Sequence, residues 1–255
     1  MLRIWVKNPA VPVEIPVVGY STTFTFFDIE GLMPVKEYSP LEYLDPLSLT
    51  SWNEFLNLPT NGTPYTSIDV VGNAVTLSGG SGVFLSPTGD GFYEFYNIVS
   101  VVDTGAIISL KDELFDNISG NYLNNVVFPA VTAISDRCFN NCQLITSITD
   151  TNFETATSIG VGSFGFCYGL ITLSLPLVET IGGGAMKYCS DIETISIPAC
   201  TSLGESVLDN DVFDSFSGQT ITLTVPSALM TCNAGSPDGD IAYLQANNTV
   251  TVITV

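Results

Sequence analysis

The sequence predicts a mainly β protein with short helical turns, built as a small N-terminal β domain followed by a solenoid with a parallel sheet. Short stretches alternate apolar and polar residues, which is the period of a half-buried strand. After residue 104 a pattern of 22 to 25 residues recurs, whereas most of the prolines and both tryptophans lie before that point. We therefore expect a Pro-rich arm and β domain over 1–103, a solenoid over 104–235 and a capping helix and strand over 236–255.

The N-terminal part contains alternating stretches separated by turn residues. Thr22–Asp28 alternates as a strand does, and Ser51–Leu58 predicts one or two helical turns that begin at a Ser cap. Ser67–Val71 and Ala74–Leu77 flank the dipeptide Gly72-Asn73, which is a signal for a II′-type hairpin. These elements predict a small β domain.

The repeats become visible when segments of equal length are aligned. Residues 126–142, 173–189 and 195–211 match in apolar character, and their prolines align at Pro129, Pro176 and Pro198. The intervening segment, 148–167, lacks the proline and carries three extra residues. A further strand-like copy, 221–226, follows after a longer spacer.

Each repeat predicts a short strand followed by a helical or 3₁₀ turn. One unit cannot bury its own apolar face, so successive units must stack, with equivalent side chains about 4.8 Å apart. We expect the following residues to form the inward core of the stack: Ile134, Ile159, Ile181, Leu203, Phe139, Phe164, Met186, Cys142, Cys167 and Cys189.

The pattern resembles the BspA-like, or Treponema-type, leucine-rich repeat. The residues that carry the resemblance are SFGFCYGLITLSLP (163–176), AMKYCSDIETISIP (185–198) and CFNNCQLITSI (138–148), and it covers roughly residues 105 to 230. In the repeat that follows, Asp211 replaces the Cys and Leu208 replaces the aromatic residue, which indicates a degenerate edge repeat or an insertion. The resemblance implies a curved binding or adhesion module of surface-exposed proteins, usually without catalysis.

The last twenty residues predict a cover for the apolar end of the stack, which terminal solenoid repeats require. Asp240 is a candidate cap for a short helix through Asn247, and Thr249–Val255 alternates as a final strand.

Composition excludes several classes of function. The chain has 26 Asp and Glu against 6 Lys and Arg, so its net charge of −20 repels nucleic acid. The absence of His excludes a Ser-His-Asp triad, a Cys-His dyad and a His-ligated zinc site. The longest uncharged run, 155–178, is rich in Gly, Ser and Thr, so we expect no membrane span. The Pro-interrupted N-terminus predicts no secretory signal.

The remaining chemistry is sparse. Six cysteines without a CxxC pair favour buried thiols over metal ligands or disulfides. Asp209, Asp211 and Asp214 lie close together and are weak calcium candidates, although solvated loop acids are the simpler interpretation. We expect no cofactor and no catalytic residue, and a carbohydrate-active enzyme with paired carboxylates is the least favoured alternative.

These features predict a non-enzymatic structural and protein-binding module. A hydroxyl-rich surface (24 Ser and 27 Thr) without a secretory signal favours a bacteriophage virion component, such as a tail, fibre or head-surface protein, made in the host cytoplasm. The expected partners are other virion subunits, further copies of the chain in a homo-oligomer or large assembly, and a host surface receptor. The alternative is a bacterial cell-surface adhesin of the BspA type.

Overall fold

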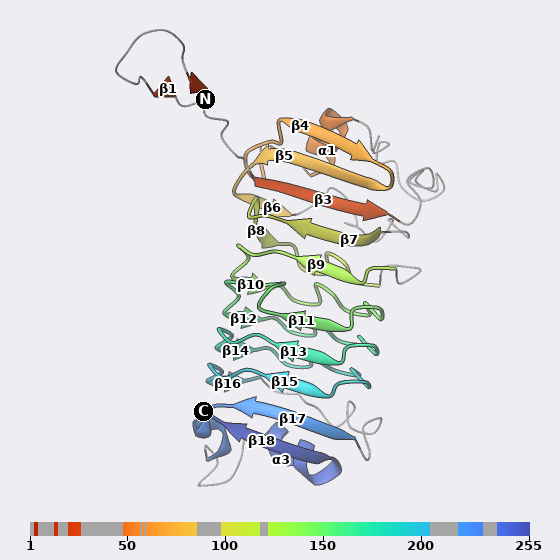
Figure 1. Cartoon of the computed structure of the whole chain (residues 1–255). Helices are drawn as coiled ribbons and strands as arrows, with labels where there is room; N and C mark the ends of the chain where they lie inside the picture. Colours follow the sequence, from red (N-terminus) through yellow and green to blue (C-terminus); the bar gives the residue numbers. More distant parts are fainter. Residues whose placement is uncertain are drawn as a thin grey trace.

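The computed structural model describes residues 3–4, 13–14, 20–26, 48–56, 58, 60–85, 98–117, 122–204, 219–231 and 239–255. Within these ranges the chain is mainly β, with helices only at α1 (Leu49–Phe55), α3 (Gly239–Asn247) and the 3₁₀ turn η2 (Ser227–Met230). Figure 1 shows the strands from β3 to β18 stacked one above another. The predicted fold class, a mainly β chain with a parallel-sheet solenoid, is confirmed.

The N-terminal strands form a five-stranded sheet of order β4-β5-β3-β7-β9. Its members are β3 (Tyr20–Phe26), β4 (Ser67–Val71), β5 (Ala74–Gly80), β7 (Ile98–Asp103) and β9 (Asn125–Val127). The turn between β4 and β5 places Gly72 at φ +57, which a glycine adopts without strain. Two smaller pairs join β1 (Arg3–Ile4) to β2 (Val13–Glu14) and β6 (Val83–Leu85) to β8 (Ile107–Leu110).

Helix α1 closes the inner face of this sheet. Trp52 is fully buried and stacks on Phe24 of β3, with ring centroids 4.7 Å apart. The cap of the helix is Ser48, whose side chain accepts from the backbone N–H of Ser51, so the expected start at Ser51 was three residues late. Two serines three positions apart both satisfy the capping preference, and the sequence alone does not separate them.

The repeats form two parallel sheets. One sheet has the order β11-β13-β15-β17-β18, and the other has the order β10-β12-β14-β16. The first comprises β11 (Ser147–Thr149), β13 (Thr172–Ser174), β15 (Thr194–Ser196), β17 (Thr220–Val225) and β18 (Thr249–Thr254). The second comprises β10 (Ala133–Ile134), β12 (Ser158–Ile159), β14 (Thr180–Ile181) and β16 (Ser202–Leu203).

The second sheet was not anticipated. It pairs Ile134 with Ile159, Ile159 with Ile181 and Ile181 with Leu203 in register, which are the positions that the sequence aligns. Consecutive turns follow β10, β12 and β14 where a helical or 3₁₀ turn was expected. The second half of each repeat therefore begins as a strand, because hydrogen bonds between neighbouring repeats hold the backbone extended there.

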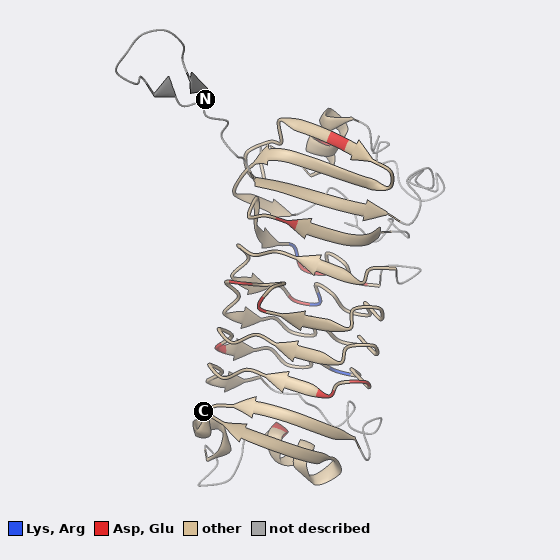
Figure 2. Ribbon diagram, viewed as in Figure 1, with Lys and Arg blue, Asp and Glu red and all other residues tan. Residues whose placement is uncertain are grey.

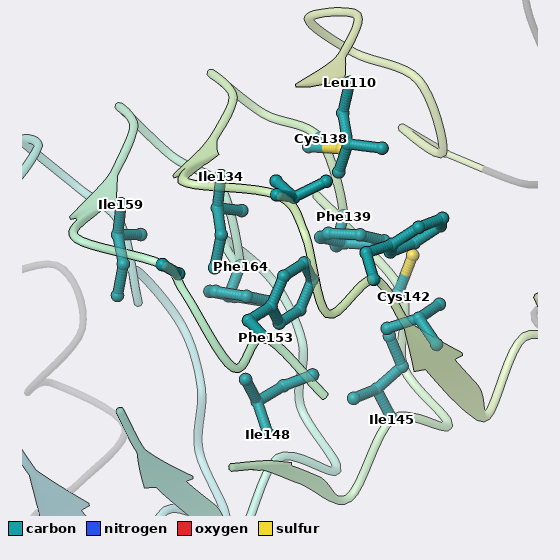
Figure 3. Packing of buried hydrophobic residues seen from close by; sticks show 14 of the residues in the cluster. Leu110, Ile134, Cys138, Phe139, Cys142, Ile145, Ile148, Phe153, Ile159 and Phe164 are labelled. Carbon is teal, nitrogen blue, oxygen red and sulfur yellow. The ribbon is translucent and has the colours of Figure 1, made fainter. Parts of the chain in front are cut away.

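The core of the solenoid consists of columns of equivalent side chains. Phe115, Phe139 and Phe164 stack in one column, with centroids 5.3 Å and 5.6 Å apart and planes within 10° of parallel. Figure 3 shows Phe139 and Phe164 beside Phe153, with Ile134, Ile145 and Ile148 around them. These buried residues belong to one apolar cluster that also includes the core of the N-terminal sheet, so the two parts share a continuous interior.

The far end of the stack is covered by α3, whose Ile241 and Leu244 are buried. The helix begins at Gly239, so Asp240 lies in its first turn and does not occupy the expected capping position. A carboxylate in the first turn still interacts favourably with the helix dipole.

Asn152 links the N-terminal sheet to the first solenoid sheet. Its side-chain amide donates to the backbone carbonyl of Val126 on β9 (2.7 Å) and accepts from the backbone N–H of Thr149 on β11 (2.8 Å). The backbone carbonyl of Asn152 accepts from the N–H of Phe128 (2.7 Å). The longer repeat that contains Asn152 thus supplies a buried amide where two sheets meet.

Replacing this amide should weaken the junction. We expect Asn152→Ala to lower the free energy of unfolding by about 1–3 kcal/mol, because a buried donor and a buried acceptor lose their partners. Urea unfolding followed by circular dichroism measures the change. Glu154→Ala, at an exposed position two residues later, is the control and should cost less than about 0.5 kcal/mol. Equal effects of the two substitutions would contradict the assigned role.

Candidate binding face

The outer face of the sheet β11–β18 carries two columns of hydroxyl side chains, which we call the hydroxyl ladder. Strand alternation places Ile148, Leu173 and Ile195 inward and buried, so the flanking residues point outward. The ladder comprises Ser147, Thr172, Thr194, Thr222 and Thr251 in one column and Thr149, Ser174, Ser196 and Thr224 in the other. Successive rungs are about 4.8 Å apart, one strand spacing.

This face is uncharged although the chain carries a net charge of −20. No residue of β9, β11, β13, β15, β17 or β18 is charged. Figure 2 shows these strands in tan. The Asp and Glu residues of the solenoid, in red, lie in the turns and connections beside them. A partner that covers the ladder therefore displaces water from hydroxyl groups and not from ions, which costs far less free energy.

Successive repeats carry a column of residues with left-handed backbone in their turns. Asn117, Asn141, Phe166 and Tyr188 have φ of +51, +60, +58 and +61 and occupy equivalent places in successive repeats. The two asparagines are joined by a side-chain hydrogen bond of 2.6 Å from Asn141 to Asn117. Asn tolerates this conformation, whereas aromatic residues rarely adopt it.

The two aromatic members of the column form part of a surface cluster of rings, which we call the ring cluster: Phe166, Tyr168 and Tyr188. The Phe166 and Tyr188 rings are 4.6 Å apart, and Tyr168 meets Phe166 edge-on at 6.3 Å. The Lys187 ammonium lies 5.3 Å from the Tyr188 ring centroid. Tyr168 is 40% exposed and precedes β13 by four residues, so the cluster lies where the strands of the ladder begin.

The left-handed backbone at Phe166 and Tyr188 has an energetic cost. A residue with a Cβ loses roughly 1–2 kcal/mol in this region relative to right-handed backbone. Contact between two aromatic rings stabilises the fold by only about 0.5–1.5 kcal/mol beyond the contribution of their buried area. Backbone strain of this kind is concentrated at functional sites in proteins. The rings are thus poorly explained by folding alone.

We expect the free energy of unfolding of the double variant Phe166→Asn, Tyr188→Asn to equal or exceed that of the wild type. Asparagine relieves the strain and can extend the amide column formed by Asn117 and Asn141. Urea unfolding measures the change, and Tyr168→Asn, whose backbone is not left-handed, should leave stability within about 0.5 kcal/mol. A loss of more than about 2 kcal/mol in the double variant would show that the rings serve mainly to hold the fold.

The residues predicted from the sequence lie in the interior and not on this face. Ile134, Ile159, Ile181, Phe139, Phe164, Met186 and the three cysteines are buried, and Leu203 is partly buried against the same cluster. Each thiol donates to a carbonyl of the preceding repeat: Cys142 to Phe115 (3.4 Å), Cys167 to Phe139 (3.1 Å) and Cys189 to Phe164 (3.1 Å).

Burial decides the chemistry of these thiols. Desolvation raises the pKa of Cys167 to about 12 and raises the pKa values of Cys142 and Cys189 well above the usual value. They are free, protonated and inaccessible, so they act as small core side chains.

The acidic candidates are a separate matter. The calcium candidates Asp209, Asp211 and Asp214 lie outside the described residues. Among the residues that are described, no group of three or more His, Cys, Asp or Glu side chains is arranged to hold a metal ion. In the same part of the chain, no helix is long and apolar enough to cross a membrane.

Comparison with known families agrees with this geometry. Residues 89–214 match the model of the BspA type leucine-rich repeat region, in 6 copies. The repeat region is therefore similar to BspA-type leucine-rich repeats. Searches of curated proteins and of solved structures gave no match. Leucine-rich repeat regions are typically non-enzymatic modules that mediate protein–protein interaction, and the BspA type is consistent with a surface or extracellular protein.

The ring cluster was missed at the level of sequence, although a signal for it existed. The residue directly before the repeated cysteine is Asn141 in one leucine-rich repeat and Phe166 and Tyr188 in the next two. The change from Asn to an aromatic residue becomes informative only when the backbone angle of that position is known.

Proposed function

We propose that the leucine-rich repeat region is a protein-docking module whose contact surface is the hydroxyl ladder together with the ring cluster. The observation that supports this most strongly is the pair of aromatic residues, Phe166 and Tyr188, kept at positive φ where a neighbouring repeat has Asn141. Strained rings at a surface are explained by a partner that contacts them.

The two parts of this surface have complementary roles. The few residues that dominate binding energy at protein interfaces are enriched in aromatic side chains, so the ring cluster is the expected anchor. The hydroxyl ladder supplies neutral donors and acceptors over a regular sheet, where a partner docks without burying an unpaired charge. A partner with an uncharged, polar contact surface fits this arrangement.

Site-specific photo-crosslinking tests the proposal. A benzophenone amino acid at position 168, in the chain produced in its native source, should give a crosslink to a defined protein. The same reagent at position 122 is a matched control, because Tyr122 is 39% exposed and Tyr168 is 40% exposed. The crosslink at 168 should be lost when Phe166 and Tyr188 are replaced by Asn. Equal yields at 168 and 122 would overturn the proposed site.

The setting that we propose is the virion of a tailed phage. The support is compositional: 51 of 255 residues are Ser or Thr, and Lys and Arg together number 6, which suits a virion surface. A bacterial cell-surface adhesin of the BspA type is the alternative. Quantification of the chain in purified particles distinguishes them, since a stoichiometric copy number supports the virion. Absence of the chain from purified particles, together with surface labelling of the chain on intact cells, supports the adhesin.

A further inference from the structure

Strand β18 forms the end of the solenoid sheet, and one of its edges faces away from its neighbour. The N–H groups of Thr249 and Val255 donate to Gln219 (2.9 Å) and Val225 (3.2 Å) on the β17 side. Because N–H groups alternate along a strand, those of Val250, Val252 and Thr254 point to the opposite edge. Within the described residues the sheet continues no further than β18 (Figure 1).

The inward side chains of β18 are incompletely covered. Val250 and Val252 stand in register with Ile221 and Leu223 of β17. The β17 residues are 0% and 1% exposed, whereas Val250 and Val252 are only partly buried. A further strand beside β18 would cover these two valines in the way that β18 covers β17.

Nothing in β18 itself discourages pairing. Natural edge strands are blunted by charged residues, proline or a bulge, and β18, with the sequence TVTVIT, contains no charged residue and no proline and pairs with β17 over six consecutive residues without a register shift. No residue from 241 to 255 is charged in a chain of net charge −20. By contrast, β4, which ends the N-terminal sheet, carries the exposed Asp69 at its centre.

We propose that two copies of this chain pair through β18, antiparallel about a two-fold axis at Thr251. The alternation of the strand is complementary to itself, since this register places Val250 of each copy opposite Val252 of the other on the buried face. Thr249 then lies opposite Ile253 on the outer face. The two five-stranded sheets become one continuous sheet, and the contact is isologous, as in most homodimers.

Because β18 carries no charged side chain, two copies with this net charge can approach each other along this strand. Acids elsewhere on the two copies still repel, and salt screens that repulsion as the Debye length falls from about 10 Å at 0.1 M to about 3 Å at 1 M. Pairing through β18 therefore tightens with salt, whereas an interface held by ion pairs would weaken.

Sedimentation of the purified full chain tests the pairing. The mass should double from 27.2 kDa as concentration rises, and the dissociation constant should fall about tenfold between 0.05 and 0.5 M NaCl. Thr251→Glu should abolish the doubling, because it places like charges opposite each other at the axis. A mixture of Thr251→Glu and Thr251→Lys should recover the dimer, whereas either variant alone stays monomeric.

The control is Ser147→Glu, an exposed position of the same ladder column on β11, which should leave the doubling unchanged. A monomer at every salt concentration overturns the proposal, including the case in which a strand of another protein occupies the edge. A dimer that survives Thr251→Glu places the interface elsewhere and overturns it equally. Neither outcome bears on the ring cluster, which lies on other repeats.

Discussion

Phe139→Ala is expected to lower the free energy of unfolding by about 3–5 kcal/mol, which is the usual cost of deleting a fully buried ring. Phe139 has no exposed surface, and its ring lies between those of Phe115 and Phe164, with Phe153 edge-on at 5.9 Å. The cavity would open in the middle of a column, where neighbours on both sides lose contacts. Urea unfolding followed by far-UV circular dichroism measures the change.

The control for Phe139→Ala is Leu144→Ala, five residues later and 47% exposed, which should cost less than about 0.5 kcal/mol. Should the Ala variant fail to fold, Phe139→Leu leaves a smaller cavity and should give a measurable, intermediate loss. Solenoid repeats contact only their neighbours, so loss of protection from hydrogen exchange should centre on the repeats beside residue 139. A loss below about 1 kcal/mol would contradict the stacked column.

Asp103→Ala is the second large effect, with an expected loss of about 2–5 kcal/mol. The carboxylate is buried and accepts from the Thr22 hydroxyl (2.7 Å) and from the N–H groups of Gly105 (2.7 Å) and Ile107 (3.1 Å). It therefore orders the turn that leads from the N-terminal sheet into the first repeat. Truncation leaves these donors without an acceptor. Ser109→Ala, at an exposed position of β8, is the control.

The same carboxylate gives a pH signature. Burial raises the pKa of Asp103 above its ordinary value. Tyr65, which shares Thr22 with Asp103 as a hydrogen-bond partner, stays neutral because burial raises its pKa too. A folded-state pKa above the unfolded value means that Asp103 contributes most stability at low pH. That contribution falls as pH rises from the ordinary value through the raised one.

The comparison with Asp103→Asn isolates this titration from the other acids of the chain. The stability of the wild type relative to the Asn variant should be greatest near pH 3.5 and should decline toward pH 7. Urea unfolding of both proteins across this range measures the difference. A gap that widens as pH rises would contradict the direction of the shift.

The repeat positions could be predicted because the sequence repeats both their spacing and their apolar character. The alignment of Ile134, Ile159, Ile181 and Leu203 corresponds to the pairing register of the structure. The second sheet could not be predicted, since strands such as Ala133–Ile134 are too short to show alternation and depend on bonds between repeats.

Several structural details, including those of the candidate binding face, could not be predicted from the sequence. Asn152 reads as a loop residue in an irregular repeat, and only the three-dimensional contacts reveal its buried amide between two sheets. The ring cluster depends on backbone angles, which side-chain periodicity does not report. The Ser and Thr residues of the hydroxyl ladder flank each buried strand residue in the sequence. That they form continuous columns becomes apparent only from the pairing register of the sheet.

Hydroxyl-radical footprinting tests most directly whether the ring cluster contacts a partner. The chain is labelled in isolation and in the particle or cell surface from which it is recovered, and modification is quantified at Tyr168 and at Tyr122, which are 40% and 39% exposed in the isolated chain. Docking through the ring cluster predicts that labelling of Tyr168 falls at least about fivefold in the assembly while Tyr122 is unchanged. Equal labelling of Tyr168 in both states would contradict it.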